Sequence, residues 1–205
     1  DFAVQIVGAV DDGTDFATSI GRMRFEVDDG SPAENAVGGA WTISTTTTAG
    51  ANTERMRIDN AGNVTKPTNC AFSVVSAAVT NITGDGTNYT MIYATEIFDK
   101  GGDFSTSTFT APVTGVYLLG CMLNISGIAS GQTDGRLTFV TGNRSYSVLI
   151  DDLTADDVGG YMRGTYTVMA DMDASDTATM LLDVTGGAKT VDVDGGNQFY
   201  GTLLQ

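Results

Sequence analysis

The chain has 205 residues, a formal net charge of −15 and no histidine. Its acidic excess repels phosphate backbones and argues against a nucleic-acid partner, and the lack of histidine removes the commonest general base and metal ligand. No apolar run approaches the roughly 20 residues that cross a bilayer, so we expect no membrane insertion. Because the chain starts with Asp1 rather than Met, we also expect an upstream part beyond it.

Composition and patterning predict an all-β chain. Thr, Val and Ile are abundant, Gly reaches 26, and no window of ten residues has a helical period. A turn signal over 60–63 and Pro67 indicate a boundary, since proline favours an extended residue before it. We therefore expect a β-rich segment over 1–66, a linker over 67–69 and a larger domain over 70–205.

The first segment contains two similar stretches, residues 22–30 and 55–62, with a strand-like run over 40–48 between them. In both stretches charged and apolar residues alternate, which places Met and Phe or Ile on one side and the arginines on the other. About 65 residues without a disulfide or metal are marginal as an independent fold. Three copies that share an axial core would remedy this shortage, and a loose extended linker is the alternative.

Two stretches of this segment carry a resemblance. Residues 21–25 (GRMRF) and 54–64 (ERMRIDNAGNV) resemble repeats near the ends of bacteriophage tail-fibre shafts. In those proteins such a stretch commonly precedes a terminal knob or a self-cleaving chaperone. The resemblance implies a trimeric shaft segment over 1–66, intertwined or stacked, and a head that follows it.

From residue 70 onward the chain reads as short strands separated by Gly, Asp and Asn turns, at the spacing of a sandwich. Residues 114–123 are apolar on both faces, as expected for a strand covered by the second sheet and by a neighbouring subunit. The strands are expected at 71–75, 91–98, 109–112, 114–123, 136–140, 144–150, 161–170, 177–184 and 199–204.

The order of several of these segments resembles the globular head of complement component 1q. The resemblance rests on 71–72 (AF), 98–99 (FD), 109–119 (FTAPVTGVYLL) and 199–204 (FYGTLL). That head belongs to the tumour-necrosis-factor-like jelly rolls. The resemblance implies a ten-strand-type jelly-roll β-sandwich over 70–205 and a homotrimer. The candidates for contacts at its three-fold axis are Phe72, Tyr117, Phe199 and Tyr200, with ordinary core positions as the alternative.

The same resemblance bears on the two cysteines, Cys70 and Cys121. In that family the last strand lies between the strands that would hold them. Two ladder spacings of about 4.8 Å separate such backbones by more than about 9 Å, whereas a disulfide needs Cα atoms within about 7 Å. We predict free, buried thiols.

Candidate ligand contacts are aromatic. Tyr89 and Tyr161 follow Gly-rich stretches and Trp41 lies in the first segment, and rings of this kind stack on sugars if they are exposed. The alternative is that each belongs to the core.

Acidic turns provide candidate metal sites, of which the first consists of Asp151, Asp152, Asp156 and Asp157. Further acidic clusters are Asp171, Asp173 and Asp176, and Asp192 with Asp194. Loop carboxylates can supply the oxygen ligands of calcium, although the spacing matches no EF-hand. The alternative is solvated turns. A glycosidase could also use paired carboxylates, but the sequence lacks an apolar pocket signal, a nucleophile elbow and a phosphate loop, and we expect no enzymatic activity.

The combined expectation is a homotrimeric bacteriophage tail-fibre tip that acts on the virion, outside the cell. It would join upstream fibre or tail proteins and attach to a host-surface glycan or protein. The alternatives are a secreted complement-like or cytokine-like ligand and a head fibre or capsid decoration. The lack of collagen Gly-X-Y repeats favours the viral shaft.

Overall fold

The computed structural model describes residues 2–15, 17–150 and 160–204, and it divides the chain into two compact units, Asp1–Asn69 and Cys70–Gln205. All regular elements of the described residues are strands. No described part of the chain forms an apolar helix of bilayer-spanning length.

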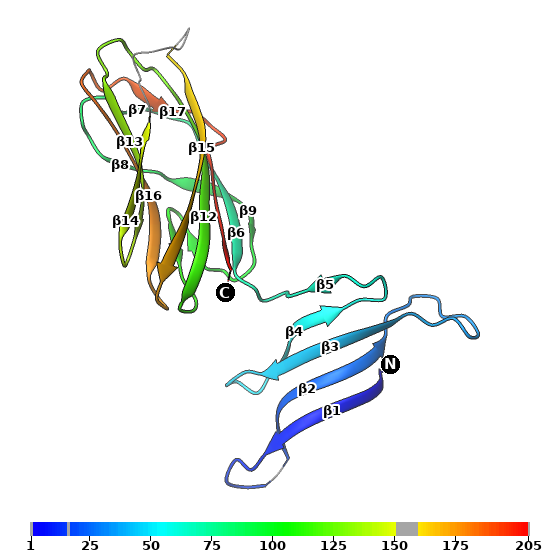
Figure 1. Cartoon of the computed structure of the whole chain (residues 1–205). Helices are drawn as coiled ribbons and strands as arrows, with labels where there is room; N and C mark the ends of the chain where they lie inside the picture. The colour runs from blue at the N-terminus through cyan, green and yellow to red at the C-terminus, as the bar shows by residue number, and fades with distance from the viewer. Residues whose placement is uncertain (1, 16, 151–159, 205) are drawn as a thin grey trace. The chain divides into compact units, whose positions relative to one another are not determined.

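The first unit is one antiparallel sheet whose strands follow chain order, coloured blue to cyan in Figure 1. Adjacent strands are joined by turns or short connections, so each strand pairs with the next one in sequence. The strands are β1 (Phe2–Val10), β2 (Thr18–Val27), β3 (Gly39–Thr46), β4 (Asn52–Ile58) and β5 (Val64–Thr65). No second layer covers either face among the described residues of this unit.

The second unit is a sandwich of two antiparallel sheets (Figure 1). One sheet has the order β7-β17-β12-β18-β6-β9, with β15 on the other side of β12. Its strands are β6 (Ala71–Ser76), β7 (Val79–Thr83), β9 (Tyr93–Asp99), β12 (Gly115–Ser126), β15 (Met162–Met172), β17 (Val191–Val193) and β18 (Gln198–Leu203). The other has the order β10-β11-β16-β13-β14, with β8 beside β16. Its strands are β8 (Tyr89–Thr90), β10 (Phe104–Ser105), β11 (Thr108–Thr110), β13 (Asp134–Thr141), β14 (Ser145–Ile150) and β16 (Thr177–Thr185).

The core of the sandwich is aromatic at one end. Phe72 packs with ring centroids 4.7 Å from Phe109, 5.2 Å from Phe104 and 5.0 Å from Phe199. Gly201 makes room for this cluster, because a Cβ there would lie 2.6 Å from the Phe72 ring. Alternation along β12 places Tyr117 and other side chains of its row in the core.

The prediction of an all-β chain with a jelly-roll sandwich is therefore confirmed. The expectation for the cysteines is confirmed as well, since Cys70 and Cys121 are free and buried. The last strand, β18, lies between β6 and β12, as the prediction required. Burial raises the pKa of both thiols to about 12.

Candidate functional site

One face of the sheet in the first unit is apolar. Phe25 of β2 pairs with Val4 on one side and with Trp41 on the other, and Trp41 pairs in turn with Ile58. Residues paired in this way share a face, since side chains alternate along each strand. The next row of the face has the same character, with the paired residues Ile6, Met23, Ile43 and Met56.

In a single copy the side chains of β1 and β2 on this face are exposed, and those of β3 and β4 are half-buried. Ile6 is 65% exposed, Phe25 is 54% exposed and Met23 is 43% exposed. The rings of Phe25 and Trp41 lie nearly parallel, 6.1 Å apart, and they line a hollow together with Val37 and Ile58. We call this surface, formed by Val4, Ile6, Met23, Phe25, Trp41, Ile43, Met56 and Ile58, the apolar face.

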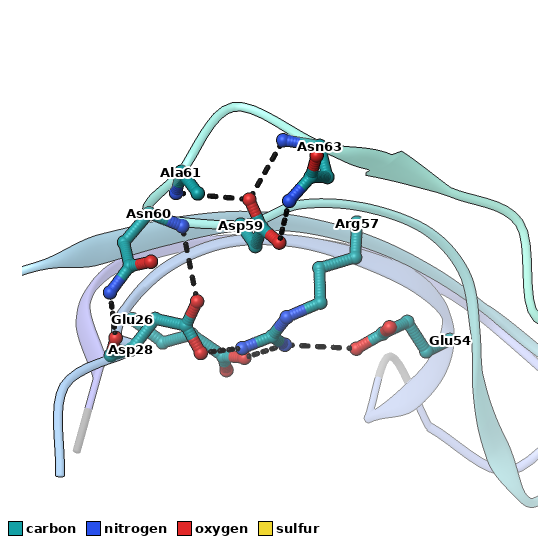
Figure 2. Close-up of polar contacts among 8 residues, drawn as sticks. All are labelled: Glu26, Asp28, Glu54, Arg57, Asp59, Asn60, Ala61 and Asn63. Atoms are coloured by element: carbon teal, nitrogen blue, oxygen red, sulfur yellow. Dashed lines mark hydrogen bonds and ion pairs between the residues drawn. The ribbon is translucent and has the colours of Figure 1, made fainter.

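The opposite face is covered by its own polar side chains. Figure 2 shows Arg57 of β4 in contact with carboxylates from two other elements: Glu26 at 2.7 Å and Asp28 at 2.7 Å, in addition to its near neighbour Glu54 at 3.3 Å. To reach Glu26 on β2, the side chain of Arg57 has to cross β3. On this face lie Ala40 and Thr42, which are the buried residues of this unit within its described ranges.

The turn after β4 supports the same cluster. Asp59 accepts hydrogen bonds from the backbone N–H groups of Ala61, at 3.0 Å, and Asn63, at 2.7 Å (Figure 2). The side chain of Asp28 binds both Arg57 and the backbone N–H of Asn60, and these contacts lower its pKa, Arg57 most strongly. The motif over 54–64 therefore fixes β4, its turn and the end of β2 as one polar assembly.

The two faces of the first unit thus differ in kind. The sequence predicted Met, Phe and Ile on one side of the sheet and the arginines on the other. The strand register agrees with this for Arg22, Arg24 and Arg57. A register shift between Ile43 and Ser44 interrupts the alternation at Arg55, whose Nε donates a hydrogen bond to Oγ1 of Thr45 at 2.8 Å. On the face that carries Arg57, polar side chains cover Ala40 and Thr42. The apolar face has no such cover in one copy.

The second unit also exposes apolar side chains on one sheet. On the outer side of β12, Leu118 pairs with Met169 of β15, which is 68% exposed. Gly120 pairs with Tyr200, and a Cβ at Gly120 would collide with that ring, so the tyrosine lies across the glycine. Phe98 of β9 is 46% exposed. We call this surface, formed by Leu118, Met122, Met169, Tyr200 and Phe98, the head face.

The proposed axial residues separate into two groups. Phe72, Tyr117 and Phe199 are at most 1% exposed and pack inside one copy. We therefore correct their assignment to a three-fold axis, because buried rings cannot reach a second copy. Tyr200 lies on the head face, half-buried, and stays a candidate for contact between copies.

The structure does not gather the three aromatic ligand candidates into one site. Trp41 belongs to the apolar face of the first unit. Tyr89 of β8 is half-buried and packs against the core of the second unit. Tyr161 is 44% exposed, and the guanidinium of Arg163 lies 5.7 Å from the centre of its ring.

Arg163 marks a feature that the sequence did not indicate. Its Nε donates a hydrogen bond to Oδ1 of Asn124 at 2.9 Å, and both residues line a hollow with Met122 and Thr165. Only the pairing of β12 with β15 brings Asn124 opposite Arg163, and this register is not readable from either segment alone.

The candidate calcium ligands Asp151, Asp152, Asp156 and Asp157 lie outside the described residues. Other acidic residues make local contacts: Asp171 of β15 binds Arg144 at 2.7 Å, and Asp192 of β17 accepts a hydrogen bond from the backbone N–H of Asn81 at 2.6 Å. Within 2–15, 17–150 and 160–204, no three acidic or cysteine side chains are grouped closely enough to hold a metal ion.

A scan against protein-family models and a search of curated proteins find no match. Solved structures do match. The globular domain of zebrafish complement 1qA is 17% identical, with a TM-score of 0.48, and the match covers 67% of this chain and 98% of that one. Murine APRIL at pH 8.0 is 10% identical, with a TM-score of 0.44 and coverage of 65% and 98%. Murine APRIL at pH 5.0 is also 10% identical, with a TM-score of 0.45, and the match covers 66% of this chain and 99% of that one.

Proposed function

We propose that the chain is the tip of a homotrimeric virion fibre, of the bacteriophage tail-fibre type, that attaches to a host cell surface. The first unit would form the end of the shaft and join upstream fibre or tail proteins. The second unit would be the head that contacts a surface glycan or protein. The proposal assigns the chain no catalytic role and places it on the virion, outside the cell.

The observation that carries the proposal is the uncovered apolar face. A stable domain buries the apolar side of a sheet against a second layer, and the described residues of the first unit supply none. Large exposed apolar patches mark interaction surfaces in soluble proteins. Identical copies are the simplest cover, because each brings the same surface at the same concentration.

The head face extends this argument to the second unit. Met169 and Phe98 are exposed on a sheet whose other side is the core of the sandwich. We propose that this face also meets neighbouring copies, with Tyr200 among the contacts. Three heads on one axis would bind a cell surface with avidity, so each contact can be weak.

Binding of labelled protein to a panel of bacterial cells tests the proposal. Phe25→Ser, on the apolar face, should lower the mass of the assembly and reduce cell binding at least tenfold, because one head lacks avidity. Val7→Ser is the matched control: Val7 is 42% exposed on the same sheet but pairs with Arg22 on the opposite face. Its mass and binding should equal those of the wild type.

Two results would contradict the proposal. One is a wild-type protein that binds none of the cells or their extracted glycans. The other is a Phe25→Ser variant that binds as well as the wild type while it sediments as a single copy. Repeating the assay with a calcium chelator tests the candidate calcium site, since loss of binding on chelation would support it.

A further inference from the structure

We infer that β1 of one copy pairs with β4 of the next, so that the first units of three copies close into a continuous antiparallel ring of strands around the apolar face. This inference rests on the proposed trimer and specifies how its shaft part is built. It gives the edges of β1 and β4 a strand partner in the neighbouring copy, in addition to covering the apolar face.

Both edges of the sheet are available for pairing. Among the described residues β1 pairs with β2 alone. On the far side, β5 pairs with Arg57 and Ile58 only, which leaves the edge of β4 over 52–56 unpaired. The edge strand β1 has the sequence FAVQIVGAV, with no charge and no proline. The register of β1 with β2 shifts between Phe2 and Val4 and again between Gly8 and Ala9, so the regular part of this edge runs from Val4 to Gly8. Soluble proteins normally protect long edge strands with charges, prolines or bulges. The stretch from Val4 to Gly8 has none of these, so it indicates a strand partner.

The direction of the strands allows closure. Neighbours in the sheet are antiparallel throughout, so β1 and β4 run in opposite directions. Rotation about an axis along the strands preserves strand direction. The β1 of a rotated copy therefore meets β4 in the antiparallel sense, and the pattern continues around the ring. A head-to-tail contact of this kind generates a closed ring when the rotation is one third of a turn.

The width of the sheet fits the same arrangement. Strands lie about 4.8 Å apart, so the four long strands make a side about 19 Å wide. Three such sides, placed as a triangular prism, lie about 5.5 Å from the common axis. Packed sheets in a sandwich are about 10 Å apart, so each lies about 5 Å from the plane between them. Side chains of ordinary size would fill the prism.

The two faces then fall on the correct sides. With Phe25 and Ile43 toward the axis, the row of Gln5, Arg24, Thr42 and Arg57 points to solvent. The ion pairs of Arg57 stay on the outer surface, where they cover Thr42 without meeting another copy.

Cysteine pairs test this edge contact directly. Within one copy β1 and β4 are three strand spacings apart, about 14 Å, beyond the reach of about 7 Å between Cα atoms for a disulfide. A disulfide between them must therefore join two copies. We would combine each of Q5C, V7C and A9C with N52C or E54C, and oxidise the assembled full-length protein. The buried native thiols, with pKa values raised to about 12, should not compete.

At least one combination should give a covalent species of three times the 21.3 kDa chain mass on a denaturing gel without reductant. The single variant V7C should stay at the mass of one chain. The double variant V7C/S44C is the matched control, because Ser44 faces the same side from the interior strand β3.

Three outcomes would overturn the inference. The first is a trimeric wild type with no covalent trimer from any combination. The second is covalent dimers from V7C alone, which would show that β1 pairs with β1. The third is equal cross-linking of V7C/S44C. After the first and third outcomes the proposed trimer would stand. Pairing of β1 with β1 is a two-fold contact, which builds no ring of three copies, so the second outcome would also count against the trimer. A wild type that sediments as a single chain would remove the proposed function itself.

Discussion

At the scale of single residues, neighbouring aromatic side chains have opposite roles. Phe199 and Tyr200 are adjacent in β18, so one points into the core and the other lies across Gly120 on the head face. The sequence identified both as important but could not tell core from surface. That distinction depends on which side of the sheet faces β10, β11 and β16, which the segment itself does not encode.

Phe72 provides the sharpest test of this separation. Phe72→Ala should lower the free energy of unfolding of the head by about 3–5 kcal/mol, as expected for an aromatic ring removed from a packed core. Tyr200→Ala should leave that free energy nearly unchanged and weaken association instead. Urea unfolding followed by near-ultraviolet circular dichroism, together with sedimentation, measures both. If the Phe72→Ala protein had normal stability but its assembly had a lower mass, Phe72 would be a contact at the three-fold axis after all.

The cysteine thiols make a second residue-scale prediction. Burial favours the neutral thiol in the folded state, so stability from these groups is complete below their ordinary value of 9.0 and is lost only as pH rises toward about 12. At pH 8 neither thiol should react with a thiol reagent such as dithionitrobenzoate within an hour. Both should react at once in denaturant. Rapid labelling of the native protein would show that the core opens.

At the scale of elements, β2 and β4 show what a sequence pattern can predict. Their alternation predicted two strands and the side on which their Met, Phe and Ile residues lie, but not the register shift beside Arg55. β1 was not predicted, because its apolar residues do not alternate with polar ones and carry no strand-specific signal. The short strands β7, β8, β10 and β17 were not predicted. Each forms few pairs with a neighbouring strand, and its extended conformation depends on tertiary contacts and not on a pattern in its own sequence. Arg163 and Asn124 meet only through the register of β12 and β15.

The polar assembly around Arg57 predicts an acid response of the first unit. Contacts with Arg57 and Asn60 lower the pKa of Asp28, so its charged form stabilises the fold above the ordinary value of 3.8, and this stabilisation is lost as pH falls below it. The melting temperature reported by Trp41 fluorescence should therefore drop between pH 5 and pH 3. Asp28→Asn should lower it at pH 7 and flatten the drop. Glu34→Gln, on the connection to β3, is the control and should behave as the wild type.

At the scale of the whole molecule, assembly and folding of the first unit should be one event. A sheet with an uncovered apolar face gains its second layer only from other copies, so its stability depends on protein concentration. Tenfold dilution should lower the melting temperature that Trp41 fluorescence reports. The signal from the head core should shift less, because that core is complete in one copy. Equal melting temperatures at all concentrations would mean that the sheet is stable alone.

The mass of the protein in solution tests the central claim most directly. Sedimentation equilibrium of the full chain at neutral pH, over a hundredfold range of concentration, should give three times 21.3 kDa, with dissociation only where the circular dichroism of the first unit is also lost. A folded protein of 21.3 kDa at every concentration, with Trp41 in its native environment, would show that the apolar face needs no partner and would contradict the account.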